Sequence, residues 1–136
     1  NGTDAVTGFS LGANTALADV IGFAGLDFAT LRGAGTDAES LMTGGALGTD
    51  TGFVVLESAL AGTSAADLDM AAEGLTGLSD GDQFFLLAGN GEDAALARVT
   101  MNGSDVEVEV MANFTGIGNL ADVTGDNILG FDTTGV

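Results

Sequence analysis

Residues 80–110 read DGDQFFLLAGNGEDAALARVTMNGSDVEVEV, in which apolar and β-branched runs are separated by two Asn-Gly dipeptides. In Phe84–Leu87 apolar side chains fall on both faces of an extended strand, which is typical of a central strand covered on both sides. Asn90-Gly91 and Asn102-Gly103 are favoured in hairpin turns, because Asn and Gly tolerate positive φ. The stretch therefore predicts a compact series of β-hairpins.

The second of these turns also predicts a strand register. If Asn102-Gly103 is a two-residue loop, apolar residues oppose each other on one face of the hairpin and a cation opposes an acid on the other. The predicted partners are Val99–Val106, Ala97–Val108, Thr100–Asp105 and Arg98–Glu107. We therefore expect Arg98 and Glu107 to form a structural pair. In the plainer alternative they form a surface ion pair worth less than about 1 kcal/mol.

Other elements are indicated on either side of this stretch. Phe53–Glu57 is apolar and β-branched, as expected of a buried strand. Ser64, followed three residues later by Asp67, resembles a helix-capping arrangement, and the apolar spacing after it predicts a short helix over about Ala65–Gly74. Asn127–Phe131 is expected to form a final strand.

The first fifty residues carry a weaker pattern. They are rich in Gly, Ala and Thr, with short apolar runs at Ala18–Phe23 and Leu26–Leu31. NTALADVIGF (14–23) and GNLADVTGDNILGF (118–131) share Leu-Ala-Asp-Val and a closing Gly-Phe, which is either a short repeat or a coincidence in an Ala- and Gly-rich chain. We predict a single, mainly β domain over residues 1–136. The expected fold is an antiparallel β-sandwich or β-roll-like sheet with one or two short helices.

Charge and composition limit the possible partners. The 136 residues include 20 acidic and two basic residues and no His or Cys, giving a formal net charge of −18 at pH 7. This charge argues strongly against binding to nucleic acid or to anionic membrane surfaces, which attract proteins through Lys and Arg. No window approaches the roughly 18 consecutive apolar residues of a membrane span, so no membrane insertion is expected. The first residue is Asn1 rather than Met, which predicts a processed product or a piece of a longer chain.

Calcium is the expected bound ion. Without His or Cys the usual ligands of transition metals are missing, and hard cations with oxygen ligands remain. Asp80 with Asp82, and Asp122 with Asp126, are spaced so that loops bring carboxylates onto one ion. Neither pair matches the EF-hand loop. The alternative is that these acids are solvated turn residues that keep the protein soluble.

The residue types present argue against an enzyme. Catalysis by His or Cys is excluded, and a Ser nucleophile would have only carboxylates as bases. Gly116–Ala121 formally matches a dinucleotide fingerprint, but too few residues follow for the elements that the motif requires. We interpret it as a turn. An alternative function is that of a hydrolase that uses paired carboxylates such as Asp80 and Asp82.

Residues 80–131 resemble the C-terminal region of bacterial proteins exported by type I secretion, the RTX-type toxins, proteases, adhesins and surface-layer proteins. That region has an Asp-rich turn, a strand ending in Leu-Leu, an Ala-Leu-x-Arg-Val strand, a Val- or Leu-rich strand ending in Thr-Gly-Ile, and a closing Asp-Asn-Ile-Leu-Gly-Phe. The matching segments here are Phe84–Leu87, Leu96–Val99, Val106–Ile117 and Asp126–Phe131. Ala18–Phe28 also resembles the segment that often follows the calcium repeats of the family.

The calcium-binding nonapeptide of this family, Gly-Gly-x-Gly-x-Asp-x-U-x with U a large apolar residue, is not repeated in tandem here. Gly2–Val6 fits only its tail, and in Gly33–Glu39 the residue Glu39 replaces the apolar one. The resemblance implies export in an unfolded state, an uncleaved C-terminal signal and calcium-assisted folding outside the cell.

Two functional hypotheses follow. The first is a non-catalytic domain, extracellular or on the cell surface, that self-associates into a surface layer, matrix or filament. The alternative is a secretion and folding module whose upstream partner, a hydrolase or an adhesin, carries the activity.

Overall fold

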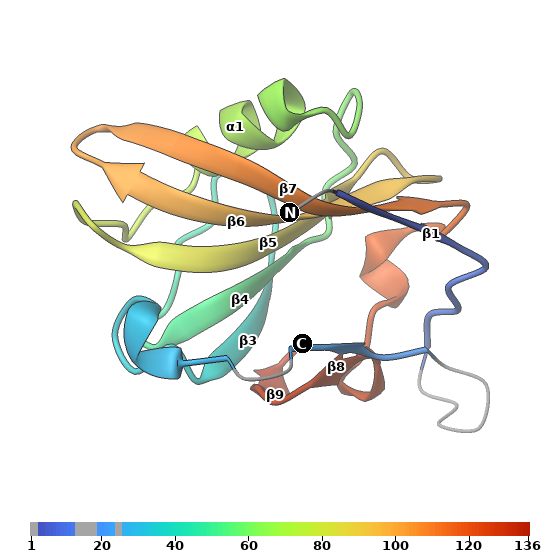
Figure 1. The fold of residues 1–136 in the computed structure, drawn as a ribbon, viewed down its shortest axis with the longest axis horizontal. Coiled ribbons are helices and arrows are strands. Elements are labelled where there is room, and N and C mark those ends of the chain that lie inside the picture. The colour runs from blue at the N-terminus through green and yellow to red at the C-terminus, as the bar shows by residue number, and fades with distance from the viewer. Residues whose placement is uncertain (1–2, 13–18, 24–25) are drawn as a thin grey trace.

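The computed structural model describes residues 3–12, 19–23 and 26–136 and is mainly β, as predicted, although its large sheet is mixed rather than antiparallel (Figure 1). The strands are β1 (Asp4–Thr7), β2 (Ile21–Gly22), β3 (Asp37–Leu41), β4 (Thr51–Leu56), β5 (Gln83–Gly89), β6 (Ala94–Asn102), β7 (Asp105–Thr115), β8 (Ile128–Leu129) and β9 (Asp132–Gly135). The helices are α1 (Ala65–Glu73) and the 3₁₀ helices η1 (Phe28–Thr30), η2 (Leu120–Asp122) and η3 (Gly125–Asn127). Parts of four predicted features lie outside the described residues: Ala18 of the apolar run Ala18–Phe23, residues 14–18 of the N-terminal echo, residues 18, 24 and 25 of the RTX-like segment Ala18–Phe28, and Gly2 of Gly2–Val6.

Seven strands form one mixed sheet in the order β1-β7-β6-β5-β4-β3-β9. Only β5, β6 and β7 pair in antiparallel fashion, and this is the stretch in which the sequence predicts hairpins. The other neighbours are parallel. Parallel pairing of β4 with β5 follows from the helix between them, because parallel strands need a crossover connection.

The sheet is covered on both faces (Figure 1). On one face α1 packs over a cluster that includes Val54, Phe84 and Leu86. On the other face, Phe85 and Leu87 belong to a second cluster, to which residues of β2, β8 and the segment around η2 contribute. Consecutive residues of β4 and β5 thus alternate between two cores, as strand geometry requires. The predicted two-sided burial of Phe84–Leu87 is confirmed.

Helix α1 begins where its cap was predicted. Ser64 Oγ accepts a hydrogen bond from the Asp67 backbone N–H at 3.2 Å, and Asp67 accepts one from the Ser64 N–H at 3.1 Å. This capping box satisfies donors that the first turn leaves without intrahelical partners. No helix in the described part of the chain is long and apolar enough to cross a membrane.

The register of the second hairpin corrects the prediction. The two-residue loop is Gly103-Ser104, and the partners are shifted by two residues, so that Val99 lies opposite Val108 and Arg98 opposite Glu109 rather than Glu107. Gly103 has a φ of +69°, whereas no described residue other than Gly has a positive φ. A loop with Gly first fits a type II′ turn, while a type I′ turn would force positive φ on Asn102. A shift of two keeps every side chain on its face, so the apolar and charged matches survive.

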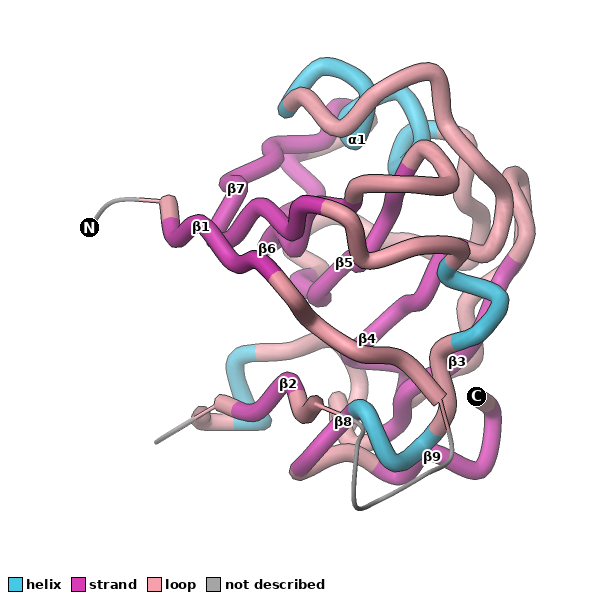
Figure 2. The backbone as a smooth tube through the Cα atoms, turned by 90° about the vertical axis from the view of Figure 1, so that its right-hand side faces the viewer, coloured by secondary structure: helices cyan, strands magenta, loops and turns pink. Residues whose placement is uncertain are grey.

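The beginning of the chain pairs with its end (Figure 2). Strand β1 lies parallel to the end of β7, β2 is parallel to β8, and β3 is parallel to β9. The pairing of Ile21 with Ile128 joins the two segments that share Leu-Ala-Asp-Val in the sequence. The predicted final strand, Asn127–Phe131, is only two residues long as β8, and β9 follows it.

Candidate functional site

Arg32 is a buried structural cation. It is 8% exposed, and its Nη2 donates a hydrogen bond to the Gly77 carbonyl at 2.6 Å. Nη1 donates to the Gly48 carbonyl, and Nε lies 3.3 Å from Asp82 Oδ2. The guanidinium therefore links the loop before β4, the loop after α1 and the turn before β5.

Asp80 and Asp82 were predicted as calcium ligands, and both carboxylates accept hydrogen bonds from the protein itself. Asp82 Oδ2 accepts a hydrogen bond from the Ser79 N–H at 2.8 Å in addition to its pair with Arg32. Asp80 Oδ1 accepts one from the Gly103 N–H at 2.7 Å and so ties this turn to the tip of the β6–β7 hairpin. A carboxylate that already faces a guanidinium gains less from a cation, so Asp82 is the weaker metal ligand of the two.

Asp122 and Asp126, the second predicted pair, lie on different short helices, η2 and η3. Across residues 3–12, 19–23 and 26–136 the structure contains no group of three or more acidic residues arranged to hold a metal ion. A calcium site built from these four Asp residues stays a prediction.

Arg98, the second cation, pairs with Glu109 across β6 and β7. The side chains are 49% and 61% exposed, as expected of a surface ion pair. Glu107, the predicted partner, lies opposite Thr100 and accepts a hydrogen bond from Asn102 Nδ2 at 3.2 Å. The ion pair predicted from the sequence is therefore formed with the next acid along the same face of β7.

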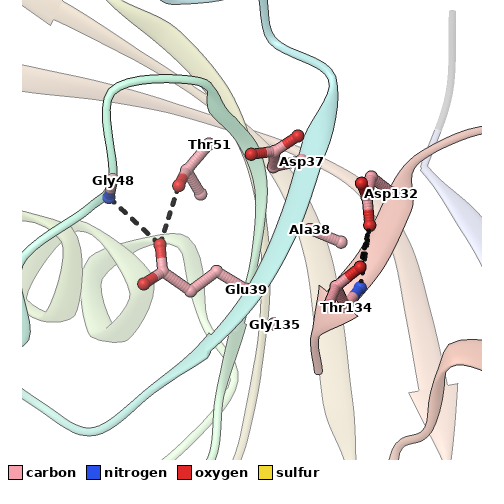
Figure 3. Close-up of a pocket in the computed structure, with 8 residues that line it drawn as sticks. All are labelled: Asp37, Ala38, Glu39, Gly48, Thr51, Asp132, Thr134 and Gly135. Carbon is pink, nitrogen blue, oxygen red and sulfur yellow. Dashed lines mark hydrogen bonds between the residues drawn. The ribbon is translucent and has the colours of Figure 1, made fainter.

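Three acids surround an open pocket of about 220 Å³ at the β3–β9 end of the sheet (Figure 3). Glu39 Oε2 accepts hydrogen bonds from the Gly48 N–H at 3.1 Å and from Thr51 Oγ1 at 2.7 Å. Asp37 and Asp132 are direct partners in the parallel pairing of β3 with β9. Like charges opposite each other weaken strand pairing, so this edge carries an electrostatic cost that a cation would relieve.

Hydrogen bonds from Thr134 lower the pKa of Asp132. Thr134 donates to it with both its hydroxyl and its backbone N–H, the latter at 3.0 Å. These bonds, the hydroxyl first, hold the pKa of Asp132 below the usual 3.8. The carboxylate is therefore fully ionised at neutral pH, and so β9 presents a fixed negative charge.

The two edges of the sheet are both short and acidic. At one end of the strand order β1 begins with Asp4, and three of its four residues are exposed. At the other end β9 begins with Asp132, and its register with β3 shifts after the first pair. Charges and irregularities of this kind keep unpaired strand edges from associating indiscriminately.

Sequence reasoning missed two residues that organise these regions. Arg32 has no helical or strand pattern around it, and the only signal for it was that the chain has just two basic residues. Asn127 is 1% exposed, and its amide donates to the carbonyls of Ser10 at 3.2 Å and Asp19 at 2.9 Å. Its Oδ1 accepts from the Gly12 N–H at 3.1 Å. The only signal for Asn127 was that it lies in residues 118–131, the segment that shares Leu-Ala-Asp-Val with residues 14–23.

No protein family, no curated protein and no solved structure matches this chain.

Proposed function

We propose that this chain is a non-catalytic structural domain of an RTX-like protein exported by type I secretion, which assembles outside the cell into a surface layer, matrix or filament. The observation that carries the proposal is the relation between the two sheet edges. Strands β7, β5, β4, β3 and β9 run in one direction, with only β6 opposed, and β1 is parallel to β7. Hence β1 and β9 run in the same direction at opposite ends of the sheet.

This relation permits open-ended assembly. When β1 of one copy is added beside β9 of the next, the two strands are parallel. This matches the existing parallel pairing of each edge strand with its neighbour inside one copy. Such a head-to-tail contact uses two different surfaces, and so generates a filament or layer rather than a closed dimer. A contact made by four-residue strands is small, so assembly would depend on protein concentration.

Calcium has a role at this junction. In-register pairing of the two four-residue strands places Asp4 of one copy opposite Asp132 of the other, with Asp37 on the next strand inward. Two copies together then supply carboxylates that one copy does not bring together. Hard divalent cations bind carboxylate oxygens, so calcium would join two edges that otherwise repel each other.

Electron microscopy and analytical ultracentrifugation in CaCl₂ and in EGTA test this proposal, with MgCl₂ at equal concentration as the control for ionic strength. The wild type should form ordered polymers in CaCl₂ that dissociate with EGTA. A double variant, Asp4→Asn with Asp132→Asn, lacks the edge charges and should behave identically in both buffers.

The matched control for this experiment is Asp105→Asn with Glu107→Gln, which removes the same charge from the β6–β7 hairpin. It should keep the calcium response of the wild type. A wild type that stays monomeric at every calcium and protein concentration contradicts the proposal.

The second candidate is a secretion and folding module. Residues 128–135, at the end of the RTX-like stretch and just beyond it, provide β8 and β9, the strand partners of β2 and β3. An export-signal region that also completes the fold suits a module fused to a hydrolase or an adhesin. The length of coding sequence upstream of residue 1 discriminates between the two, since hundreds of preceding residues favour the module.

A further inference from the structure

A larger pocket, of about 540 Å³, lies over the face of the sheet opposite α1. Its volume falls within the range of about 300–1,000 Å³ that is usual for small-molecule sites. Residues of four strands line it, among them Asp4 of β1, Leu96 and Arg98 of β6, and Glu109 of β7. Gly22 of β2 and the adjacent Phe23 complete the lining.

The floor of this pocket contains a β-bulge. Leu96 pairs with Ala112, and the next residue, Ala97, pairs with Val110, so that Met111 has no partner on β6. Met111, Val110 and Ala112 all line the pocket. A bulge bends a strand and redirects a side chain, which is why bulges are frequent beside binding sites.

The wall of the pocket is fixed in place. The ring of Phe23 stacks on Phe85, with ring centroids 4.3 Å apart and an angle of 24° between the planes. Two further rings, Phe53 and Phe131, contact it edge-on at 6.2 and 6.1 Å. Four rings packed together leave Phe23 little rotational freedom, so a ligand would find this surface already formed.

The rim of the pocket offers both donors and acceptors. Arg98 donates from Nη2 to Glu109 Oε2. Within the described part of the chain, Arg98 Nε and Nη1 donate to no residue, and Glu109 Oε1 accepts from none. Asp4 sits across the pocket in register with Ala112. Hydrogen-bonding groups thus lie beside the apolar side chains of Phe23, Leu96 and Met111.

We infer that this pocket binds a neutral saccharide. Two carboxylates against one guanidinium make the site negative, and the whole chain carries −18, so anionic ligands are repelled. Because Glu109 already neutralises Arg98, a ligand gains more from the unused donors and acceptors of this pair than from a new ion pair. The neighbouring hydroxyls of a sugar both accept and donate hydrogen bonds. The C–H face of a pyranose ring fits the apolar side chains of Leu96 and Met111 beside the ring of Phe23.

Two-dimensional ¹H–¹⁵N NMR titration of the full chain tests the inference, with glucose, galactose, mannose and their disaccharides as probes. At least one should shift the amide signals of Gly22, Leu96 and Ala112 with a Kd of about 1 mM, the affinity expected of a ligand with about a dozen heavy atoms. Glucuronate should bind less well than glucose.

The variants Arg98→Ala and Glu109→Gln should each weaken binding about tenfold, since each removes a charged hydrogen-bonding group. Glu107→Gln removes the same charge from the same strand outside the pocket and should leave the Kd unchanged. Two results would overturn the inference: no shift of these amides at 50-fold the expected Kd, or binding of an apolar amino acid in preference to every sugar.

Discussion

Arg32 Nε lies 3.3 Å from Asp82 Oδ2, and their side chains are 7% and 21% exposed. One of only two cations in a strongly acidic chain is thus used inside the molecule, where it also donates hydrogen bonds to the carbonyls of Gly48 and Gly77. A guanidinium suits this position because its planar fork presents several donors at once.

Replacement of Arg32 should destabilise the fold severely. Arg32→Met leaves the Asp82 carboxylate and two carbonyls without their donor, and loss of one partner of a buried pair costs about 3–5 kcal/mol. Urea unfolding followed by far-UV circular dichroism measures the free energy of unfolding. Arg98→Met serves as the control, because the same substitution at the exposed pair should cost less than about 1 kcal/mol. Equal losses in the two variants would contradict the structural role of Arg32.

The side-chain amide of Asn127 should be required for the stability of the fold. Asn127→Asp keeps the shape but loses the donors to Ser10 and Asp19 and places a charge in a buried site, at a cost of about 2–4 kcal/mol. The loss should shrink at acidic pH, where the new carboxyl is protonated. Asn119→Asp is the matched control, since Asn119 caps η2 from an exposed position through Oδ1, and Asp caps equally well. Thermal unfolding at several pH values distinguishes the two variants.

Gly33 should tolerate no side chain. It has a φ of +56°, and a Cβ at this position would lie 2.2 Å from the Thr49 carbonyl oxygen. Gly33→Ala should therefore cost at least about 2 kcal/mol through overpacking and backbone strain. Gly91 also has a positive φ, +97°, but a Cβ there would meet nothing within 4 Å. Gly91→Ala should cost only about 1 kcal/mol of strain, so a comparison of the two isolates the steric contribution in a urea titration.

The titration of Asp132 should depend on the Thr134 hydroxyl. The folded-state pKa lies below 3.8, so the stabilisation is fully present above that pH and is lost as the pH falls through the folded pKa. Carboxyl ¹³C NMR should give a midpoint below 3.8, which Thr134→Val raises and Thr134→Ser restores. A midpoint that Thr134→Val leaves unchanged would assign the low pKa to another cause.

The sequence was most informative where local patterns decide the structure. The two-sided burial of Phe84–Leu87 and the cap at Ser64 follow from side-chain alternation and from hydrogen bonding between near neighbours. The register of the β6–β7 hairpin was wrong by two residues, because patterns of period two are equally satisfied by such a shift. Only the φ requirement of Gly103-Ser104 separates the alternatives.

Parallel pairing was the main feature missed. A βαβ unit places its two strands parallel. The sequence contains this pattern, in strand Phe53–Glu57, helix Ala65–Gly74 and strand Phe84–Leu87, and the pattern predicts the parallel alignment of β4 with β5. The pairings of β1, β2 and β3 with β7, β8 and β9 leave no local pattern. They depend on tertiary contacts, as do the positions of Arg32 and Asn127.

These pairings also govern the order in which the chain can fold. Residues 4 and 21 find their strand partners only at residues 112 and 128, whereas β3 pairs with the nearby β4 as well as with the distant β9. Contacts so distant along the chain slow folding, because the intervening loop must be closed before they form. Until residues 112–115 and 128–129 have been synthesised, β1 and β2 have no strand to join. Strands β1 and β2 therefore join the fold late, after the central strands of the sheet have been made.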